Sequence, residues 1–335
     1  VVIVFFQRKD PKSVWAWLLI LYFIPVLGFV FYLLAGTDVY KAKLFRTKEI
    51  EDKLSDAIRR QESSIRNKEI PESYPEMKDY EDLMLYNLQT AGAVISDDNE
   101  VEIIVDGKEK FRKLFADLEG ACKSIHIQYY IIKDDEIFGE MTEILKRKVK
   151  QGVEVRVLFD AMGCRTMGRK KWRELEEAGI ETAEFFPAFF GRLQLRINYR
   201  NHRKIVVVDG QTAYVGGFNV AREYVGLDEK FGYWRDTHMR ITGTAVQALQ
   251  TRFILDWNYA NRKHIIPFEP YLADSEKEQR TGSPVQIISS GPDTHEKSIR
   301  DTYLRMIHKA NRSIYIQTPY FIPDEAIFSA LLIAT

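Results

Sequence analysis

An uncharged, apolar run of 23 residues near the start of the chain is the feature that most limits how this 335-residue sequence can fold. The run extends from Val14 to Gly36 and contains no Asp, Glu, Lys or Arg. As one helix it would be roughly 34 Å long at about 1.5 Å per residue, enough to cross a bilayer core of about 30 Å. Pro25 and Gly28 lie mid-run, where a membrane helix tolerates them better than a soluble one. The run therefore predicts a transmembrane anchor.

The residues on either side of this run extend the membrane interpretation. The apolar stretch at 1–6 is interpreted as the end of an earlier span, so that 1–36 would form a membrane hairpin. Lys and Arg follow Gly36 in modest excess, which is typical of the cytoplasmic side. The two cysteines, Cys122 and Cys164, form no disulfide framework, as expected in a reducing compartment. We therefore expect the chain after residue 36 to be cytoplasmic.

Composition excludes several classes of protein. Lys plus Arg and Asp plus Glu number 48 each, so the formal net charge is zero. A protein that coats nucleic acid is usually strongly basic, and we expect no nucleic-acid partner. Hydrophobic residues make up 45% of the chain, which excludes wholesale disorder. A chain of this length and composition can bury a substantial core.

The pattern beyond the anchor divides into four segments. Residues 37–95 are charged and are interpreted as a juxtamembrane stalk. From 96 to 261, short β-branched and aromatic runs alternate with helical spacing, which predicts a sheet with helices on its faces. Residues 262–281 are polar and irregular, as in a linker. The strand–helix pattern begins again at 282–335.

Two stretches of sixteen residues resemble each other. Residues 121–136 and 310–325 share seven identical positions at an offset of 189. Two buried strands that each precede a helix would also look alike, which is the alternative explanation. We interpret the match as a duplicated α/β domain. Its second copy would begin near Gly282 and be truncated at Thr335.

The densest chemistry lies between Asn198 and Asp236. His202, Lys204 and Asp209 form the pattern His-x-Lys-x4-Asp. Side chains on a strand alternate with a period of two, so His202 and Lys204 point to the same face. A histidine beside a fixed positive charge suits a nucleophile or proton carrier acting on phosphate. Alternatively, Asp209 forms a hairpin turn with the glycine after it, and His202 is a solvated edge-strand residue.

A glycine-rich stretch and a carboxylate follow the motif. Gly217 would let the backbone approach a ligand, and the Asn219 amide can donate to a phosphate oxygen. Asp236 supplies a carboxylate on the next apolar strand. The sequence shows no cluster of metal-ligand residues, and we expect neither a metal nor a cofactor.

These blocks resemble the phospholipase D superfamily, and most of all its membrane-anchored bacterial cardiolipin synthase branch. The resemblance covers nearly the whole chain, through the membrane segment and the stretches NHRKIVVVDG, YVGGFN, WRDTHMRITG and IYIQTPYFIPDEAI. It implies an α/β fold, namely a phospholipase D-like duplicated α-β-α sandwich domain preceded by an N-terminal transmembrane helix. Each half contributes one motif to a single active site.

The resemblance also implies a reaction and residue roles. One phosphatidylglycerol donates its phosphatidyl group to another through a phosphohistidine, giving cardiolipin and glycerol. His202 matches one of the paired histidines, most simply the nucleophile, and Lys204 with Asn219 and Gly217 would bind the phosphate. Asp236 would hold the histidine ring, with Glu223 as its competitor. Asp209 would close the turn and shape the site.

The sequence contains no second His-x-Lys-x4-Asp pattern. We therefore expect the 335-residue chain to be inactive alone, unless two copies pair in a homo-oligomer. The alternatives are a phospholipase D-type phosphodiesterase that uses water or another alcohol, and an inactive membrane scaffold. The expected partners are phosphatidylglycerol and membrane lipid. The resemblance places the protein in the bacterial cell (inner) membrane as a multi-pass protein with a cytoplasmic catalytic part.

Overall fold

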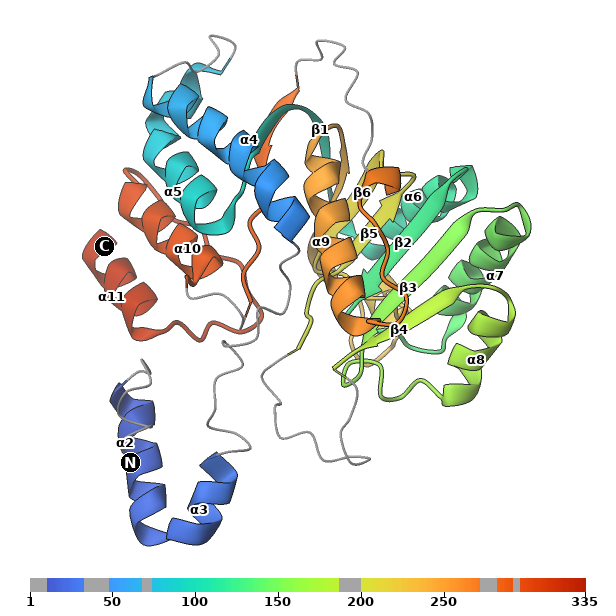
Figure 1. The fold of residues 1–335 in the computed structure, drawn as a ribbon, viewed down its shortest axis with the longest axis horizontal. Coiled ribbons are helices and arrows are strands. Elements are labelled where there is room, and N and C mark those ends of the chain that lie inside the picture. Colours follow the sequence, from blue (N-terminus) through green and yellow to red (C-terminus); the bar gives the residue numbers. More distant parts are fainter. Residues whose placement is uncertain (1–10, 33–47, 68–73, 187–199, 272–281, 292–295) are drawn as a thin grey trace.

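The structure is a computed structural model that describes residues 11–32, 48–67, 74–186, 200–271, 282–291 and 296–335 (Figure 1). Its strands are β1 (Ile95–Asp106), β2 (Ser124–Tyr129), β3 (Glu154–Asp160), β4 (Glu181–Phe185), β5 (Ile205–Val208), β6 (Thr212–Gly216), β7 (Arg235–Thr242) and β8 (Ser283–Gln286). Its α-helices are α2 (Pro11–Phe23), α3 (Pro25–Phe31), α4 (Lys48–Arg66), α5 (Glu81–Ala91), α6 (Gly107–Gly120), α7 (Glu136–Lys150), α8 (Arg169–Glu177), α9 (Ala245–Ala260), α10 (Ser298–Lys309) and α11 (Glu325–Ala334). Short 3-10 helices are η3 (Pro75–Tyr80), η4 (Arg222–Val225) and η5 (Glu269–Tyr271).

The strands form one mixed sheet of order β4-β3-β2-β5-β6-β7-β1-β8. The pairs β2–β3 and β3–β4 are parallel, and the remaining neighbours are antiparallel. This arrangement places the ends of β2, β3 and β6 beside the starts of β5 and β7, at one edge of the sheet. We call it the motif edge, because the His-x-Lys pair enters β5 there.

Helices cover both faces of the sheet, as the alternating sequence pattern predicts. Helices α6, α7 and α8 pack on one face and α9 on the other (Figure 1). The four apolar residues of β5 are all buried, as predicted for a strand covered on both sides. Val206 and Val208 pack toward the first layer, while Ile205 and Val207 pack toward α9. The mixed α/β fold is therefore confirmed.

The apolar run predicted as one span over 14–36 is not one continuous helix in the part that the structure describes. The run is divided at Ile24, which has φ −133° and ψ 66°, between α2 and α3. Pro25 causes this break, because it has no N–H and disfavours a helical conformation in the residue before it. No helix among the described residues is both long and apolar enough to cross a bilayer. Residues 1–10 and 33–36 lie outside the description.

The two similar segments, 121–136 and 310–325, share the same structure where a helix begins but differ where the first segment forms a strand. Asp135 accepts hydrogen bonds from the N–H groups of Ile137 and Phe138 at the start of α7, and Asp324 caps α11 in the same way. The segment that matches β2, residues 313–318, is in no strand of the described chain, and Tyr315 is 93% exposed. The local sequence was therefore enough to produce the aspartate N-cap in both segments. A strand also needs a neighbouring strand to pair with, and residues 313–318 have none in the described chain.

The helices before and after the sheet pack together. Helix α5, within the segment interpreted as a stalk, contacts α10: Thr302 donates to the Asn87 side chain at 2.8 Å, and Tyr86 donates to Asp301 at 3.1 Å. Strand β8 also extends the sheet beside β1. The predicted domain boundaries at 37–95, 96–261, 262–281 and 282–335 stay a prediction.

Candidate functional site

The predicted catalytic pair lies at the motif edge. Lys204 Nζ is 3.2 and 3.3 Å from the two ring nitrogens of His202, and it donates to the His202 carbonyl oxygen at 2.9 Å. Lys204 is 4% exposed, whereas the His202 ring reaches solvent. The pair thus combines a buried cation with an accessible imidazole, which suits attack on a bound anionic group.

Partial desolvation of His202 and burial of Lys204 change the pKa of both side chains. Desolvation, with Lys204 adjacent, lowers the pKa of His202 to about 4, which keeps the imidazole neutral at physiological pH. Desolvation also lowers the pKa of Lys204 to about 7, and the nearby Asp236 carboxylate partly opposes this change. A neutral histidine can act as a nucleophile, and a lysine that titrates near neutrality couples its charge to pH.

The Asp236 carboxylate occupies space left by a glycine. A Cβ added to Gly217 would lie 1.9 Å from Asp236 Oδ1, so a side chain at this position would displace the carboxylate from its observed place. The Gly217 N–H already donates to the Thr237 carbonyl at 2.9 Å. The need for glycine here therefore comes from side-chain packing inside the site.

Asn219 joins two segments of the motif edge. Its amide donates to the Tyr224 hydroxyl at 2.8 Å, and its carbonyl oxygen accepts from the Ile131 N–H at 3.1 Å. The side chain is 4% exposed. Asn219 thus holds the chain that follows β2 against η4.

Asp209 lies at the opposite edge of the sheet from His202. Its carboxylate accepts from the N–H groups of Cys122, Lys123 and Ser124 at 2.8, 2.7 and 2.9 Å, where the chain enters β2. Asp209 and Gly210 both have positive φ, 54° and 67°, as in a tight hairpin turn. Strand β5 therefore separates the third residue of the motif from the first two.

Glu223 makes its own ion pair. It is 6% exposed and pairs with Lys133. Asp236, in contrast, acts electrostatically on Lys204. Of the two carboxylates weighed from the sequence, Asp236 is the one whose charge raises the pKa of Lys204.

Two buried aspartates that the sequence analysis missed hold the segment around His202. Asp256, on α9 and fully buried, accepts from Asn201 at 2.9 Å and from Arg203 at 3.1 Å. Asp160, at the end of β3 and also fully buried, accepts from the Asn201 N–H at 3.0 Å. A signal for Asp256 was available, because a charged residue interrupts the apolar stretch before Trp257, but nothing indicated its partner.

An aromatic ring completes the surroundings of the pair. The Tyr130 ring centroid lies 4.5 Å from that of His202, and Lys204 Nζ lies 5.4 Å from the same ring. A Cβ on Gly163 would come within 1.8 Å of the Tyr130 carbonyl oxygen, so the loop after β3 passes directly against Tyr130. The Asp160 carboxylate orients this loop by accepting from Met162 and Gly163.

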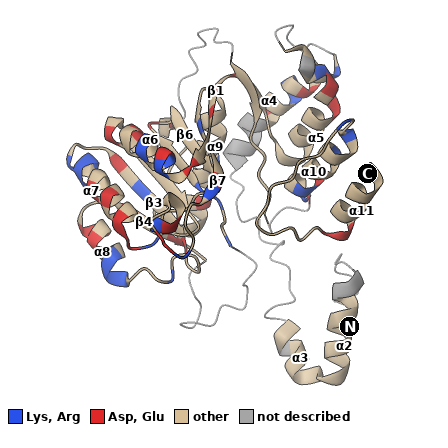
Figure 2. Ribbon diagram, turned by 180° about the vertical axis from the view of Figure 1, so that it is seen from behind, with Lys and Arg blue, Asp and Glu red and all other residues tan. Residues whose placement is uncertain are grey.

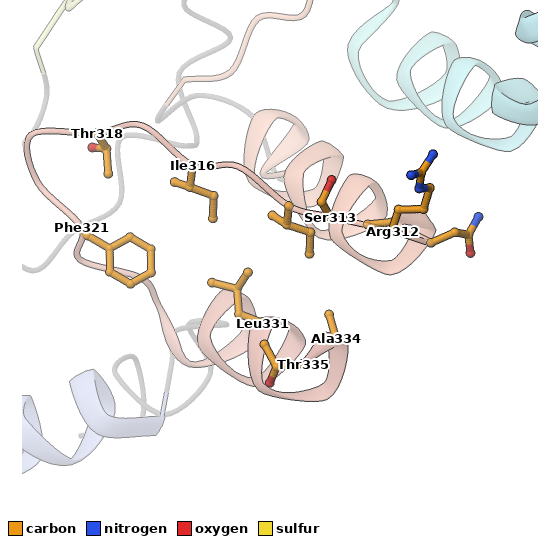
Figure 3. Close-up of a pocket in the computed structure, with 11 residues that line it drawn as sticks. Arg312, Ser313, Ile316, Thr318, Phe321, Leu331, Ala334 and Thr335 are labelled. Atoms are coloured by element: carbon orange, nitrogen blue, oxygen red, sulfur yellow. The ribbon is translucent and has the colours of Figure 1, made fainter.

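Other features of the described chain lack this chemistry. Among the described residues, no group of three or more His, Cys, Asp or Glu could hold a metal ion. A hollow of about 610 Å³ lies between the 310–321 segment and α11 (Figure 3). Its lining mixes apolar side chains with Asn, Ser and Thr, and Arg312 is its charged side chain, so it contains no carboxylate, histidine or cysteine.

Comparisons with known proteins agree with the sequence resemblance. Residues 114–257 match the family model described as cardiolipin synthase, PLD-like domain, and residues 1–36 match the phospholipase D-nuclease N-terminal model. Among solved structures, NucT from Helicobacter pylori is 12% identical, with a TM-score of 0.38, covering 48% of this chain and 97% of that one.

Curated relatives match over the whole chain. The major cardiolipin synthase ClsA of Bacillus subtilis (strain 168) is 45% identical over 336 residues, covering 100% of this chain and 69% of that protein. A cardiolipin synthase of Listeria monocytogenes serotype 4a (strain HCC23) is 43% identical over 335 residues, with 99% and 69% covered. This chain belongs to the bacterial cardiolipin synthase family of the phospholipase D superfamily.

Proposed function

We propose that this protein transfers the phosphatidyl group of one phosphatidylglycerol to a hydroxyl of another, giving cardiolipin and glycerol. The observation that carries the proposal is the accessible His202 ring beside the buried Lys204 ammonium, with Nζ within 3.3 Å of both ring nitrogens. Membership of the cardiolipin synthase family indicates the substrate class.

In the first step, a neutral His202 nitrogen attacks the phosphorus of the donor lipid. An N–P bond forms, the P–O bond to the glycerol headgroup breaks, and the departing oxygen takes a proton from a general acid. The acceptor hydroxyl then gives its proton to the same group as its oxygen attacks the phosphorus and the N–P bond breaks. Lys204 stabilises the charge on the phosphoryl oxygens in both steps.

The other site residues support this pair. Asp236 is the proposed carboxylate that stabilises the imidazolium formed on His202, because its charge already acts on Lys204. Gly217 leaves room for that carboxylate. Asn219 is proposed to place its second amide hydrogen toward the phosphate, and Asp209 to fix the far end of β5. The sequence 1–335 holds one His-x-Lys-x4-Asp pattern, and pairing of two copies would bring two His202 side chains to one site.

The proposed setting is the bacterial cell membrane, with the catalytic part on the cytoplasmic side. The uncharged run at 14–36 and the match of 1–36 to the N-terminal family model support an anchor there. The multi-pass arrangement and pairing of copies are part of this proposal.

The test supplies labelled phosphatidylglycerol in mixed micelles to the longest natural form of the protein. We expect labelled cardiolipin and free glycerol, and His202→Gln should lower turnover by at least about a thousandfold. His308→Gln is the matched control, because His308 is an exposed histidine on α10 that bonds to the Leu304 carbonyl.

Two outcomes would contradict the proposal. Release of phosphatidic acid without cardiolipin would identify a phospholipase that uses water as acceptor. Normal turnover in the His202→Gln variant would remove His202 from the reaction.

A further inference from the structure

We propose that a basic surface on α8 and the loop before it docks against the anionic headgroups of a phospholipid bilayer. The surface consists of Arg165, Arg169, Lys170 and Arg173. This proposal rests on the proposed function in one respect: the basic surface would hold the motif edge at the membrane in which the lipid substrate resides.

The local charge of this surface departs from that of the chain. Between Arg165 and Arg173 five of nine residues are basic and none is acidic, although the whole sequence has zero net charge. Lys171 pairs with Glu174 at 3.3 Å. The four residues of the basic surface are exposed, and within the described chain none has an ion pair. Arg169 is close enough to Glu184 for its charge to lower the pKa of that carboxyl against the dominant effect of burial, but no ion pair joins the two among the described residues. The basic surface thus remains available to an external anion.

Helix stability does not account for this arrangement. Helix α8 has no acidic residue in its first turn and no basic residue in its last turn, and its basic residues gather at its start (Figure 2). Cations near a helix N-terminus are unfavourable because they face the positive end of the helix dipole. The basic residues at the start of α8 therefore destabilise the isolated helix. Because they do not help the helix to fold, we infer that they serve in binding.

The basic surface lies beside the catalytic pair. Strand β3 ends at the motif edge, so the loop that carries Arg165 and the start of α8 lie at the same edge as His202. Arg165 is close enough to Tyr130 for its charge to lower the pKa of that phenol against the dominant effect of burial. The Tyr130 ring in turn contacts the His202 ring.

The apolar residues of α8 face the core. The Trp172 ring stacks on Phe159 with centroids 3.7 Å apart, and Leu175 is fully buried. The exposed side therefore offers charge with little apolar area, which fits contact at the level of the headgroups. Anionic lipid fits better than nucleic acid, because the acidic residues that follow on α8 and the neutral net charge would limit a long phosphate track.

The test measures partitioning of the 335-residue chain onto vesicles. It compares phosphatidylcholine alone with phosphatidylcholine containing about one-third phosphatidylglycerol. The ratio of the two partition coefficients isolates the contribution of the anionic headgroups, because apolar segments of the chain bind both kinds of vesicle equally. In the variant Arg169→Gln/Lys170→Gln/Arg173→Gln we expect this ratio to fall by about tenfold or more, since each basic residue near an anionic surface contributes roughly fivefold.

The matched control removes three basic residues at the opposite edge of the sheet: Lys123→Gln/Arg147→Gln/Lys150→Gln. This variant should keep the wild-type ratio. An equal loss in both variants, or no loss in the first, would overturn the docking surface. A loss of binding to a DNA duplex with an unchanged vesicle ratio would assign the surface to nucleic acid and also overturn it. Failure of the proposed function is separate, because it would show as absence of cardiolipin with the vesicle ratio intact.

Discussion

The ring of Tyr130 packs against the ring of His202, with centroids 4.5 Å apart and planes inclined at 51°. Tyr130 follows β2, and its carbonyl oxygen lies against Gly163 and within 3.5 Å of Cys164 Sγ. The phenol ring is therefore held by a loop from β3 while it limits the rotation of an otherwise accessible imidazole. Tyr130 is a positioning residue by this geometry.

Removing the Tyr130 ring should reduce turnover, and this loss should appear in protein that is still folded. We expect Tyr130→Ala to lower kcat by roughly 10- to 100-fold, because a misplaced nucleophile loses orientation. Tyr130→Phe keeps the ring and should retain kcat within about threefold. Steady-state kinetics beside a urea unfolding curve would check this. Equal kinetics for the Ala and Phe variants would show that the ring has no positioning role.

The pH dependence of kcat/KM should report the catalytic pair. Activity needs neutral His202, which is present above its pKa of about 4, and charged Lys204, which is present below its pKa of about 7. The profile should therefore fall on the alkaline side near neutrality as Lys204 loses its proton. Lys204→Arg should remove this alkaline fall, because arginine stays charged.

Asp236 provides a second pH measurement. Its carboxylate raises the pKa of Lys204 against the effect of burial, so Asp236→Asn should move the alkaline limb to lower pH. If the alkaline limb stays in place in both the Lys204→Arg and Asp236→Asn variants, a group other than Lys204 causes it.

Asp209 should act on stability, because its carboxylate binds three N–H groups at the far edge of the sheet. We expect Asp209→Ala to lower the free energy of unfolding by about 1–3 kcal/mol. Asp209→Asn should lose less, since asparagine keeps an acceptor oxygen and tolerates positive φ. Denaturant unfolding checks both values. Loss of turnover in fully folded Asp209→Asn protein would instead place Asp209 in the catalytic machinery.

Asp256 should support the segment around His202. Asp256→Asn replaces a fully buried carboxylate by an amide beside the partly exposed Arg203, and we expect a loss of about 1–3 kcal/mol in unfolding free energy. At a temperature where the variant is still folded, kcat should also fall. The control is Arg252→Gln, which removes a partner of the other Asp256 oxygen. It should lower stability and leave kcat nearly unchanged. A similar kcat in both variants would limit Asp256 to folding.

Local sequence was sufficient for the elements around the site. The apolar residues Ile205–Val208 form a strand buried on both faces. The spacing of two residues predicted that His202 and Lys204 lie together, and they do, although residues 201–204 are in no strand. Gly152 and Gly179, which follow α7 and α8, both have φ of +88°, a conformation that glycine adopts without strain. These inferences depend on neighbours in the chain, so sequence spacing alone was enough.

Contacts between distant segments were decided by the tertiary structure. Pairing of β5 with β2 carried Asp209 to the edge opposite His202, and packing of α9 brought Asp256 to Arg203. The apolar run at 14–36 is long enough for one membrane helix, but the structure divides it at Ile24. The sequence by itself determined the family, the α/β pattern and the His-x-Lys pair, because these follow from residue type and spacing. Strand order and helix packing determined which carboxylate acts electrostatically on Lys204, because burial and charge proximity depend on residues far apart in the chain.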